Sequence, residues 1–184
     1  MTLALTPSQT VGPFFGPALL REARNVLADG STPGVAIRIE GRVLDGVGEP
    51  VPDAVVEIWQ ADASGRYAHP LDGGLTTGFT GFGRSGTEDG GRFWFQTVKP
   101  GAVAFEGKWQ APHMVVTVAS RGMLNHAVTR MYFEDEEAAN DADPVLALVP
   151  AERRTTLKAR RDAPNVYRFD IVLQGESETV FFNV

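Results

Sequence analysis

The chain has 184 residues, no cysteine, and 23 acidic against 17 basic residues, which gives a net charge of −6. The lack of cysteine excludes disulfide scaffolds, zinc ribbons, iron–sulfur clusters and thiol nucleophiles. The acidic balance argues against a general nucleic-acid binder, because that role needs a positive surface. The 20 glycines and 12 prolines indicate many turns and favour an all-β protein over a helical one.

The sequence carries no signal that would take it to a membrane. No apolar run approaches the roughly 18–20 residues of a membrane span. Met1 to Leu5 have no positive charge ahead of a short apolar stretch, so they do not resemble a signal peptide. We therefore expect a cytoplasmic protein.

The first 34 residues read differently from the rest of the chain. Four prolines punctuate residues 1–34, which predicts an irregular N-terminal arm with one short helix over 18–28. Such an arm would lie on a body, either its own or that of a partner. Residues 35–184 then form the expected body, and residues 1–184 together form one domain.

Apolar alternation predicts about eight strands in this body, separated by turn-rich segments. They cover 35–44, 54–61, 92–98, 113–119, 127–133, 155–160, 166–173 and 179–184. Regular spacing of short strands is typical of a β-sandwich, so we expect one with mostly antiparallel strands. The polar and glycine-rich stretch 62–91 predicts a long functional loop. One or two short helices are expected in the acidic segment 134–143 and in 144–149.

Two short motifs carry little functional information. Residues 81–86 match the pattern GxGxxG, but a strand follows them rather than the helix that a nucleotide site requires. We interpret them as a glycine-rich turn. Asp141 and Asp143 form a DxD pair without the loop of an EF-hand, so we expect a solvated acidic face there.

Histidine and tyrosine are the remaining candidates for chemistry. The chain has three histidines, His69, His113 and His126. Tyr67 and His69 would share a face of an extended segment, and phenolate and imidazole groups suit ferric iron. The candidates are scattered along the chain, however, so an ordinary buried tyrosine and ordinary histidines remain the simpler interpretation from spacing alone.

Several longer segments resemble the intradiol ring-cleavage dioxygenases. The run VEIWQADASGRY (56–67) is specific to this family, as is the Lys99–Pro100–Gly101 turn that follows a later strand. The resemblance extends over 6–15, 41–70, 82–101, 111–122, 129–136 and 167–182. It implies a β-sandwich and an activity that cleaves a catechol ring with O2.

The resemblance also allows each iron ligand to be checked. The catalytic chain of the family holds Fe(III) with two tyrosines and two histidines, of which Tyr67 and His113 match one each. The second histidine falls at Val115, and the second tyrosine falls within 102–105, which contains no phenol. An arginine of the catalytic chain matches Gln110. The resemblance therefore implies a chain that binds no metal itself, with Tyr67 and His113 as a vestigial ligand pair.

This departure resembles the alpha chains of the two-chain members of the family, in which only the beta chain carries Fe(III). The resemblance implies a beta-chain partner, protocatechuate as the aromatic substrate, and 3-carboxy-cis,cis-muconate as the product in aromatic catabolism through the beta-ketoadipate pathway. The substrate pocket lies between the two chains. The positions of this chain that match its walls are Thr10, Gly12, Pro13, Phe14 and Arg130.

Each of these positions has a physical rationale and a simpler alternative. Arg130 would complement a ring carboxylate or support the pocket by hydrogen bonds, or else form an ion pair at the rim of a chain–chain interface. It should share a strand face with Tyr132, opposite Met131. Gly12 and Pro13 would let the backbone approach the ring, or belong to an arm that merely crosses the partner.

Two other functions remain open at this point. The chain could be a stand-alone β-sandwich module that binds small aromatics without catalysis. It could also be a homo-oligomeric enzyme with an unusual metal site built from Tyr67, His69, His113 or His126. A stable monomer that binds catechols would favour the first, and stoichiometric metal in the purified chain would favour the second.

Overall fold

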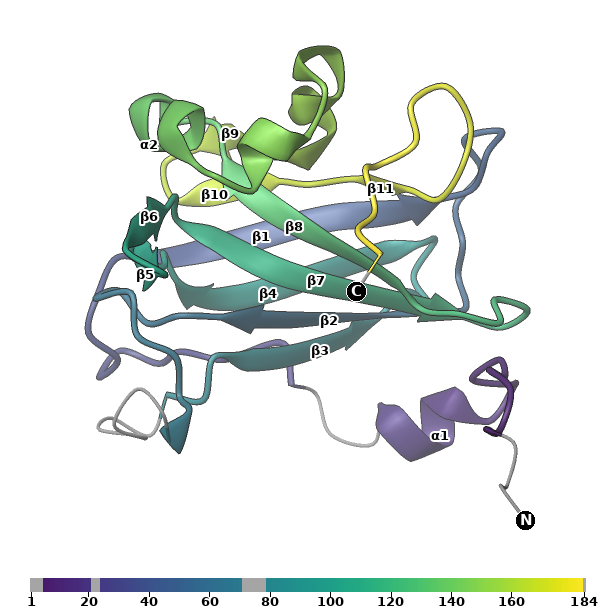
Figure 1. Ribbon diagram of the computed structural model, residues 1–184. Helices are drawn as coiled ribbons and strands as arrows, with labels where there is room; N and C mark the ends of the chain where they lie inside the picture. Colours follow the sequence, from purple (N-terminus) through teal and green to yellow (C-terminus); the bar gives the residue numbers. More distant parts are fainter. Residues whose placement is uncertain (1–4, 21–23, 71–78, 184) are drawn as a thin grey trace.

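A computed structural model describes residues 5–20, 24–70 and 79–183 (Figure 1). Its strands are β1 (Ala36–Leu44), β2 (Ala54–Gln60), β3 (Phe82–Gly86), β4 (Arg92–Val98), β5 (Val103–Phe105), β6 (Lys108–Gln110), β7 (His113–Ser120), β8 (Ala127–Phe133), β9 (Lys158–Ala163), β10 (Val166–Arg168) and β11 (Ile171–Val172). Its helices are short: α1 (Phe15–Leu19), α2 (Glu137–Ala142), and the 3-10 helices η2 (Leu146–Leu148) and η3 (Ala151–Leu157). The all-β fold class is confirmed.

One curled sheet forms both layers of the sandwich. Its strands follow the order β11-β1-β10-β9-β8-β7-β2-β3, and β4 pairs with β1 on the other side. Pairing is antiparallel except where β1 meets β10 and β11 and where β8 meets β9. The sheet bends back on itself, so that it nearly closes into a barrel-like sandwich (Figure 1).

Part of the arm fills the opening between the two free edges. Arg24 bridges to Arg84 of β3 and Val26 bridges to Gln96 of β4. The Leu27 amide donates to the Gln96 carbonyl at 2.8 Å, and the Gln96 amide donates to the Asn25 carbonyl at 2.7 Å. These bonds satisfy backbone groups that an open sheet edge would leave unpaired.

This pairing corrects the expected helix over 18–28. The helix of the arm, α1, occupies Phe15–Leu19 instead, and Arg24–Val26 are extended. Residues 21–23 of the expected helix lie outside the described residues. Local pattern favoured a helix, but the edges of β3 and β4 offer this segment backbone partners that only the folded sheet provides.

The core lies between the two layers and follows the predicted alternation. Ile37, Ile39, Gly41 and Val43 of β1 are buried, while the residues that alternate with them are half-buried. Gly41 interrupts this apolar series for a steric reason: a Cβ there would stand 1.8 Å from the Phe169 carbonyl oxygen. The strands expected at 92–98 and 127–133 have the bounds that β4 and β8 show.

Three other expectations need correction. The loop expected over 62–91 contains β3, whose Gly83 leaves room for the Leu27 side chain: a Cβ there would lie 2.7 Å from Leu27 Cδ1. Residues 155–157, expected to begin a strand, belong to η3, where the Thr156 hydroxyl donates to the Arg153 carbonyl. Residues 179–183 form no regular strand: Phe182 bridges to Val128, and the Thr179 amide donates to the Val172 carbonyl at 2.9 Å.

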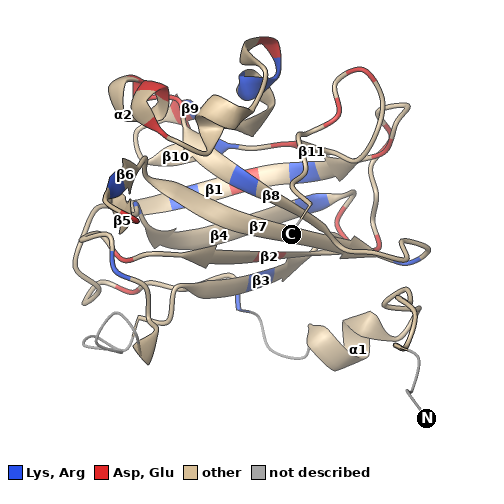
Figure 2. Cartoon of the chain, in the orientation of Figure 1, with Lys and Arg blue, Asp and Glu red and all other residues tan. Residues whose placement is uncertain are grey.

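The helical segments expected after β8 are confirmed as α2 and η2. Figure 2 shows acidic residues gathered on α2 and on loops at the ends of the sandwich. Among the described helices, none is long and apolar enough to cross a membrane.

Candidate functional site

Tyr67 and His113, which the family resemblance singled out, meet at the start of β7. His113 is 1% exposed, and its Nδ1 donates to the Ala111 carbonyl at 2.7 Å. Since a carbonyl only accepts, this bond leaves Nε2 without a proton and able to accept from the Tyr67 hydroxyl, 3.4 Å away. The Tyr67 ring is stacked on Trp59, with ring centroids 5.9 Å apart. The structure therefore brings Tyr67 and His113 together.

Burial decides the ionisation of this cluster. It lowers the pKa of His113 to about 4, and the positive charge of Arg130 acts in the same direction. The imidazole is therefore neutral at pH 7. Burial also raises the pKa of Tyr132, and the neighbouring Asp143 carboxylate adds to the effect. Tyr132 stays protonated and donates its hydroxyl to Asp143 Oδ1 at 3.1 Å.

Arg130 lies beside this pair on the adjacent strand. In the β7–β8 register it stands opposite Val115, and its Nη1 donates to Gln110 Oε1 at 3.0 Å. Met131 is part of the sandwich core, whereas Tyr132 packs in a separate cluster outside it. Arg130 and Tyr132 thus share the outer face of β8, as the alternation predicted.

These side chains line a pocket of about 410 Å³. The hairpin of β5 and β6 forms one wall, and the turn before η2 contributes another. The lining residues are Tyr67, Val103, Phe105, Glu106, Lys108, Gln110, His113, Arg130, Pro144 and Val145. The pocket therefore combines apolar walls with a few polar groups, which is the usual composition of a small-molecule site.

The residues present do not fit the Fe(III) centre that the family resemblance gives to the catalytic chain. Val115 occupies the strand position two residues after His113, on the same face, and its side chain has no donor atom. The run after the Lys99–Pro100–Gly101 turn forms β5 and brings no phenol. One imidazole and one phenol hydroxyl are too few to hold ferric iron against water.

The other histidines do not complete a metal site. His126 precedes β8, whose first residue, Ala127, pairs with Val118 near the far end of β7. His69 is exposed, and its backbone amide donates to the Tyr67 carbonyl at 2.8 Å. Within the described part of the chain, no three His, Cys, Asp or Glu side chains are grouped as metal ligands would be.

The predicted pocket residues of the arm lie elsewhere. The Thr10 hydroxyl oxygen accepts from the Gly122 amide at 2.9 Å, just after the end of β7. Gly12 has φ +72°, and Phe14 is 79% exposed. Pro13 is exposed between them. In Figure 1, α1 and the described residues before it lie at one end of the sandwich and the β5–β6 hairpin at the other. Within one chain, the arm and Arg130 do not form one surface.

Asp143 is the site residue that sequence reasoning missed. It is fully buried, so the solvated acidic face expected for Asp141 and Asp143 is wrong at Asp143, although Asp141 is exposed. Its carboxylate accepts from the amides of Ala111, Val145 and Leu146 at 2.7–2.9 Å, besides the Tyr132 hydroxyl. The Asp143–Pro144 dipeptide before a helical turn was the available signal, because Asp-Pro favours turn initiation.

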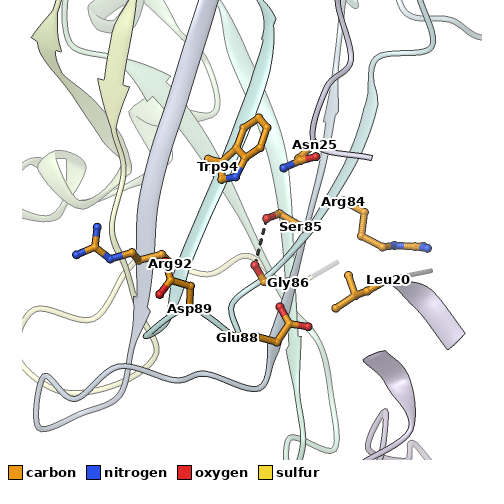
Figure 3. Close-up of a pocket in the computed structure, with 9 residues that line it drawn as sticks. All are labelled: Leu20, Asn25, Arg84, Ser85, Gly86, Glu88, Asp89, Arg92 and Trp94. Atoms are coloured by element: carbon orange, nitrogen blue, oxygen red, sulfur yellow. Dashed lines mark hydrogen bonds between the residues drawn. The ribbon is translucent and has the colours of Figure 1, made fainter. Parts of the chain in front are cut away.

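A second pocket, of about 330 Å³, lies near the closure between β3 and β4 (Figure 3). It includes Arg84, which is paired with Glu57 at 2.6 Å, and Ser85, which donates to the Gly86 carbonyl. Residues 82–86 of the GxGxxG match form β3, so the expected turn is a strand instead. None of the predicted site residues lines this pocket.

Comparisons with known proteins place the chain in a family. The family model described as "Dioxygenase" matches residues 11–175. The alpha chain of protocatechuate 3,4-dioxygenase from Burkholderia cepacia is 50% identical, over 100% of this chain and 99% of that one. The beta chain from the same organism is 34% identical, over 85% of this chain and 72% of that one.

Solved structures agree with this placement. The dioxygenase domain of a dioxygenase and carbohydrate-binding protein fusion from Streptomyces sp. SirexAA-E is 27% identical, with a TM-score of 0.60. The match covers 94% of this chain and 99% of that one. The sandwich and these similarities lead to one conclusion: the chain belongs to the dioxygenase family, as a subunit of the intradiol ring-cleavage type.

Proposed function

We propose that this chain is the iron-free, alpha-type subunit of a two-chain protocatechuate 3,4-dioxygenase, assembled with an iron-bearing beta chain. The observation that carries the proposal is the contact between Tyr67 and His113, while Val115 stands where the family resemblance places a second imidazole. The similarity to both alpha and beta chains supports it. Residues 1–34 would serve as the arm and 35–184 as the body of one cytoplasmic domain.

The assembled enzyme would break the ring bond between the two hydroxylated carbons of protocatechuate. Both atoms of O2 enter the product, 3-carboxy-cis,cis-muconate, and the partner's Fe(III) supplies the redox chemistry. This chain would contribute shape and binding. Gly12 and Pro13 allow close approach of backbone to a ring, and the exposed Phe14 offers an apolar wall. Thr10 fastens this part of the arm to the turn after β7.

Arg130 lies far from the arm, so its proposed role is separate. It is separated from the Thr10 contact by most of the length of β7, about 3.3 Å per residue. The arm and Arg130 would therefore approach a partner's substrate from different faces of this chain. Its guanidinium would complement a carboxylate, or support the pocket through its hydrogen bond to Gln110.

The test compares this chain alone with this chain co-expressed with a beta chain. Iron content, the tyrosinate-to-Fe(III) visible band and oxygen uptake with protocatechuate are measured on both. We expect a colourless, inactive lone chain and a coloured, active pair. A lone chain that holds about one iron and consumes oxygen would contradict the ligand argument.

The arm is tested in the same pair with Phe14→Ala. Losing a ring that walls the substrate should raise KM about tenfold, while iron content stays at the wild-type level. Val47→Ala is the matched control, because Val47 is also apolar and 84% exposed, but lies in the turn after β1. Equal kinetics for the two variants would remove the arm from the substrate pocket.

A further inference from the structure

A guanidinium on β3 holds the carboxyl end of α1. Arg84 Nη1 donates to the Leu19 carbonyl at 3.2 Å, and the Arg84 backbone amide donates to the Arg24 carbonyl at 3.0 Å. The side chain of Leu20, just after α1, stands against β3, because a Cβ on Gly86 would lie 2.6 Å from its Cδ1. Figure 3 shows Arg84 and Leu20 in the pocket that both of them line. Arg84 therefore contacts the arm at two separate points.

This arginine is itself fixed by an ion pair. Glu57 of β2 lies directly opposite Arg84 in the β2–β3 register, and its Oε1 accepts from Arg84 Nε at 2.6 Å. The two side chains are only 22% and 29% exposed. The guanidinium also lies over the Phe82 ring, 5.4 Å from its centroid. Glu57 and Phe82 thus orient the planar fork of donors, and Nη1 faces the arm.

The helix α1 needs such a support, because it has little stability of its own. It contains five residues, far fewer than the roughly 12–15 that an isolated helix requires. No side chain caps its N-terminus, and Phe15 is its buried residue. The last carbonyl groups of any helix have no partner within it, and the bond from Arg84 satisfies that of Leu19. Contacts with the body, rather than the helix itself, therefore decide where α1 lies.

Phe14 stands at the other end of this helix. It is the residue before α1, its carbonyl accepts from the Ala18 amide at 3.3 Å, and its side chain is 79% exposed. A displacement of α1 would therefore displace Phe14. We propose that Arg84 is a positioning residue: by holding Leu19, it sets where α1 presents the Phe14 ring to a partner chain. The consequence for substrate rests on the proposed function, whereas the anchoring of α1 does not.

The anchoring is measured with a spin label on α1. The chain has no cysteine and Ala18 is exposed, so Ala18→Cys gives a single labelling site on the full-length chain. Electron paramagnetic resonance then reports how fast the label moves. Arg84→Met removes the donors but keeps a long side chain. We expect it to shorten the rotational correlation time of the label by a factor of about two or more.

A matched control exists on the other layer of the sandwich. Arg38 of β1 also pairs with a glutamate, Glu40, and also lies over an aromatic ring, that of Trp94. Within the described chain it forms no hydrogen bond with α1, so Arg38→Met should leave the label as in the unsubstituted chain. Arg84→Lys is a second test variant. Lysine keeps the charge opposite Glu57 but lacks the fork that reaches two acceptors at once, so the label should again move faster.

The link to Phe14 is tested in the chain paired with a beta chain. Arg84→Met should raise the KM for protocatechuate about threefold to tenfold, with kcat and iron content unchanged. In a Phe14→Ala background the same substitution should change KM by less than about twofold, because the ring that Arg84 positions is gone. A general structural role for Arg84 would instead give equal effects in the two backgrounds.

Two results would overturn the proposal. They are an unchanged label mobility in a folded Arg84→Met variant, or equal effects of Arg84→Met on KM with and without the Phe14 ring. If Arg84→Met does not fold, as near-UV circular dichroism would show, Arg84→Lys decides by the same criteria. If Phe14→Ala by itself leaves KM unchanged, the arm lies outside the substrate pocket and the proposed function fails there. The spin label still decides, in that case, whether Arg84 holds α1.

Discussion

The two ends of β7 differ in how firmly they belong to the fold. At its start, His113 and the adjacent Tyr132 and Asp143 are each 1% exposed or less. Tyr132 donates to Asp143, and both His113 and Asp143 are hydrogen-bonded to the backbone of Ala111. At its end, Ser120 meets an exposed arm through the Thr10 hydroxyl. The start of β7 is part of the buried body, whereas the end of β7 only contacts the exposed arm.

This difference shows which of the residues singled out by the family resemblance are built into the fold. The ligand function at the start of β7 is incomplete, since Val115 has no donor atom. His113 is nevertheless kept in a buried cluster whose hydrogen bonds join β7, β8 and the turn before η2. We infer that this end is retained for stability, whereas the arm is available for function between chains. Three predictions test that division.

The largest effect is expected at Asp143. Asp143→Ala removes the acceptor for three backbone amides and the Tyr132 hydroxyl, all in the buried cluster. Leaving such donors unsatisfied should lower the free energy of unfolding by about 3–5 kcal/mol. Urea denaturation measures it.

The control for this loss is two residues away in the chain. Asp141 is exposed on α2, so Asp141→Ala should change the free energy of unfolding by less than about 0.5 kcal/mol. Equal effects of the two substitutions would mean that the cluster does not stabilise this end of β7.

The next effect is a pH dependence that originates at His113. Its pKa is about 4 in the folded chain and 6.5 as the ordinary value. Between these values the unfolded chain binds a proton that the folded chain does not, so acidification favours unfolding. The free energy of unfolding should fall by about 2 kcal/mol as the pH drops from ~6.5 to ~4.5.

The contribution of this imidazole is isolated by comparing how steeply the free energy of unfolding changes with pH in each variant, rather than the free energies themselves. His113→Gln should flatten the decline in that pH range, because the titrating group is gone. His126→Gln removes an exposed imidazole and should leave the decline as in the wild type. An unchanged slope in His113→Gln would show that His113 is protonated in the folded chain near its ordinary pKa.

Features set by local pattern could be predicted from the sequence. The alternation of β1 identified Ile37 and Ile39 as inward-facing, and the same pattern placed Arg130 and Tyr132 on one face of β8. The contact of Tyr67 with His113 followed from the family motif, not from spacing, because the two residues are 46 positions apart.

Features set by distant partners could not be predicted in this way. Residues 24–27 are extended because the edges of β3 and β4, far along the chain, supply their hydrogen bonds. Asp143 belongs to an acidic run that looks solvated, and its burial becomes favourable only when Ala111 and Tyr132 donate to it. The pocket wall formed by the β5–β6 hairpin likewise exists only in the folded chain.

The smallest effect is expected at the other end of β7. Thr10→Val removes the acceptor for the Gly122 amide, but this bond is exposed, so water can replace it. The free energy of unfolding should change by less than about 1 kcal/mol, as for Thr6→Val, a control in the same exposed arm. When the chain is paired with a beta chain, Thr10→Val should raise the KM for protocatechuate, because the arm is no longer held at the end of β7. Thr6→Val should not change this KM. A large loss of stability in Thr10→Val would show that the arm belongs to the body, and that the two ends of β7 are not divided as inferred.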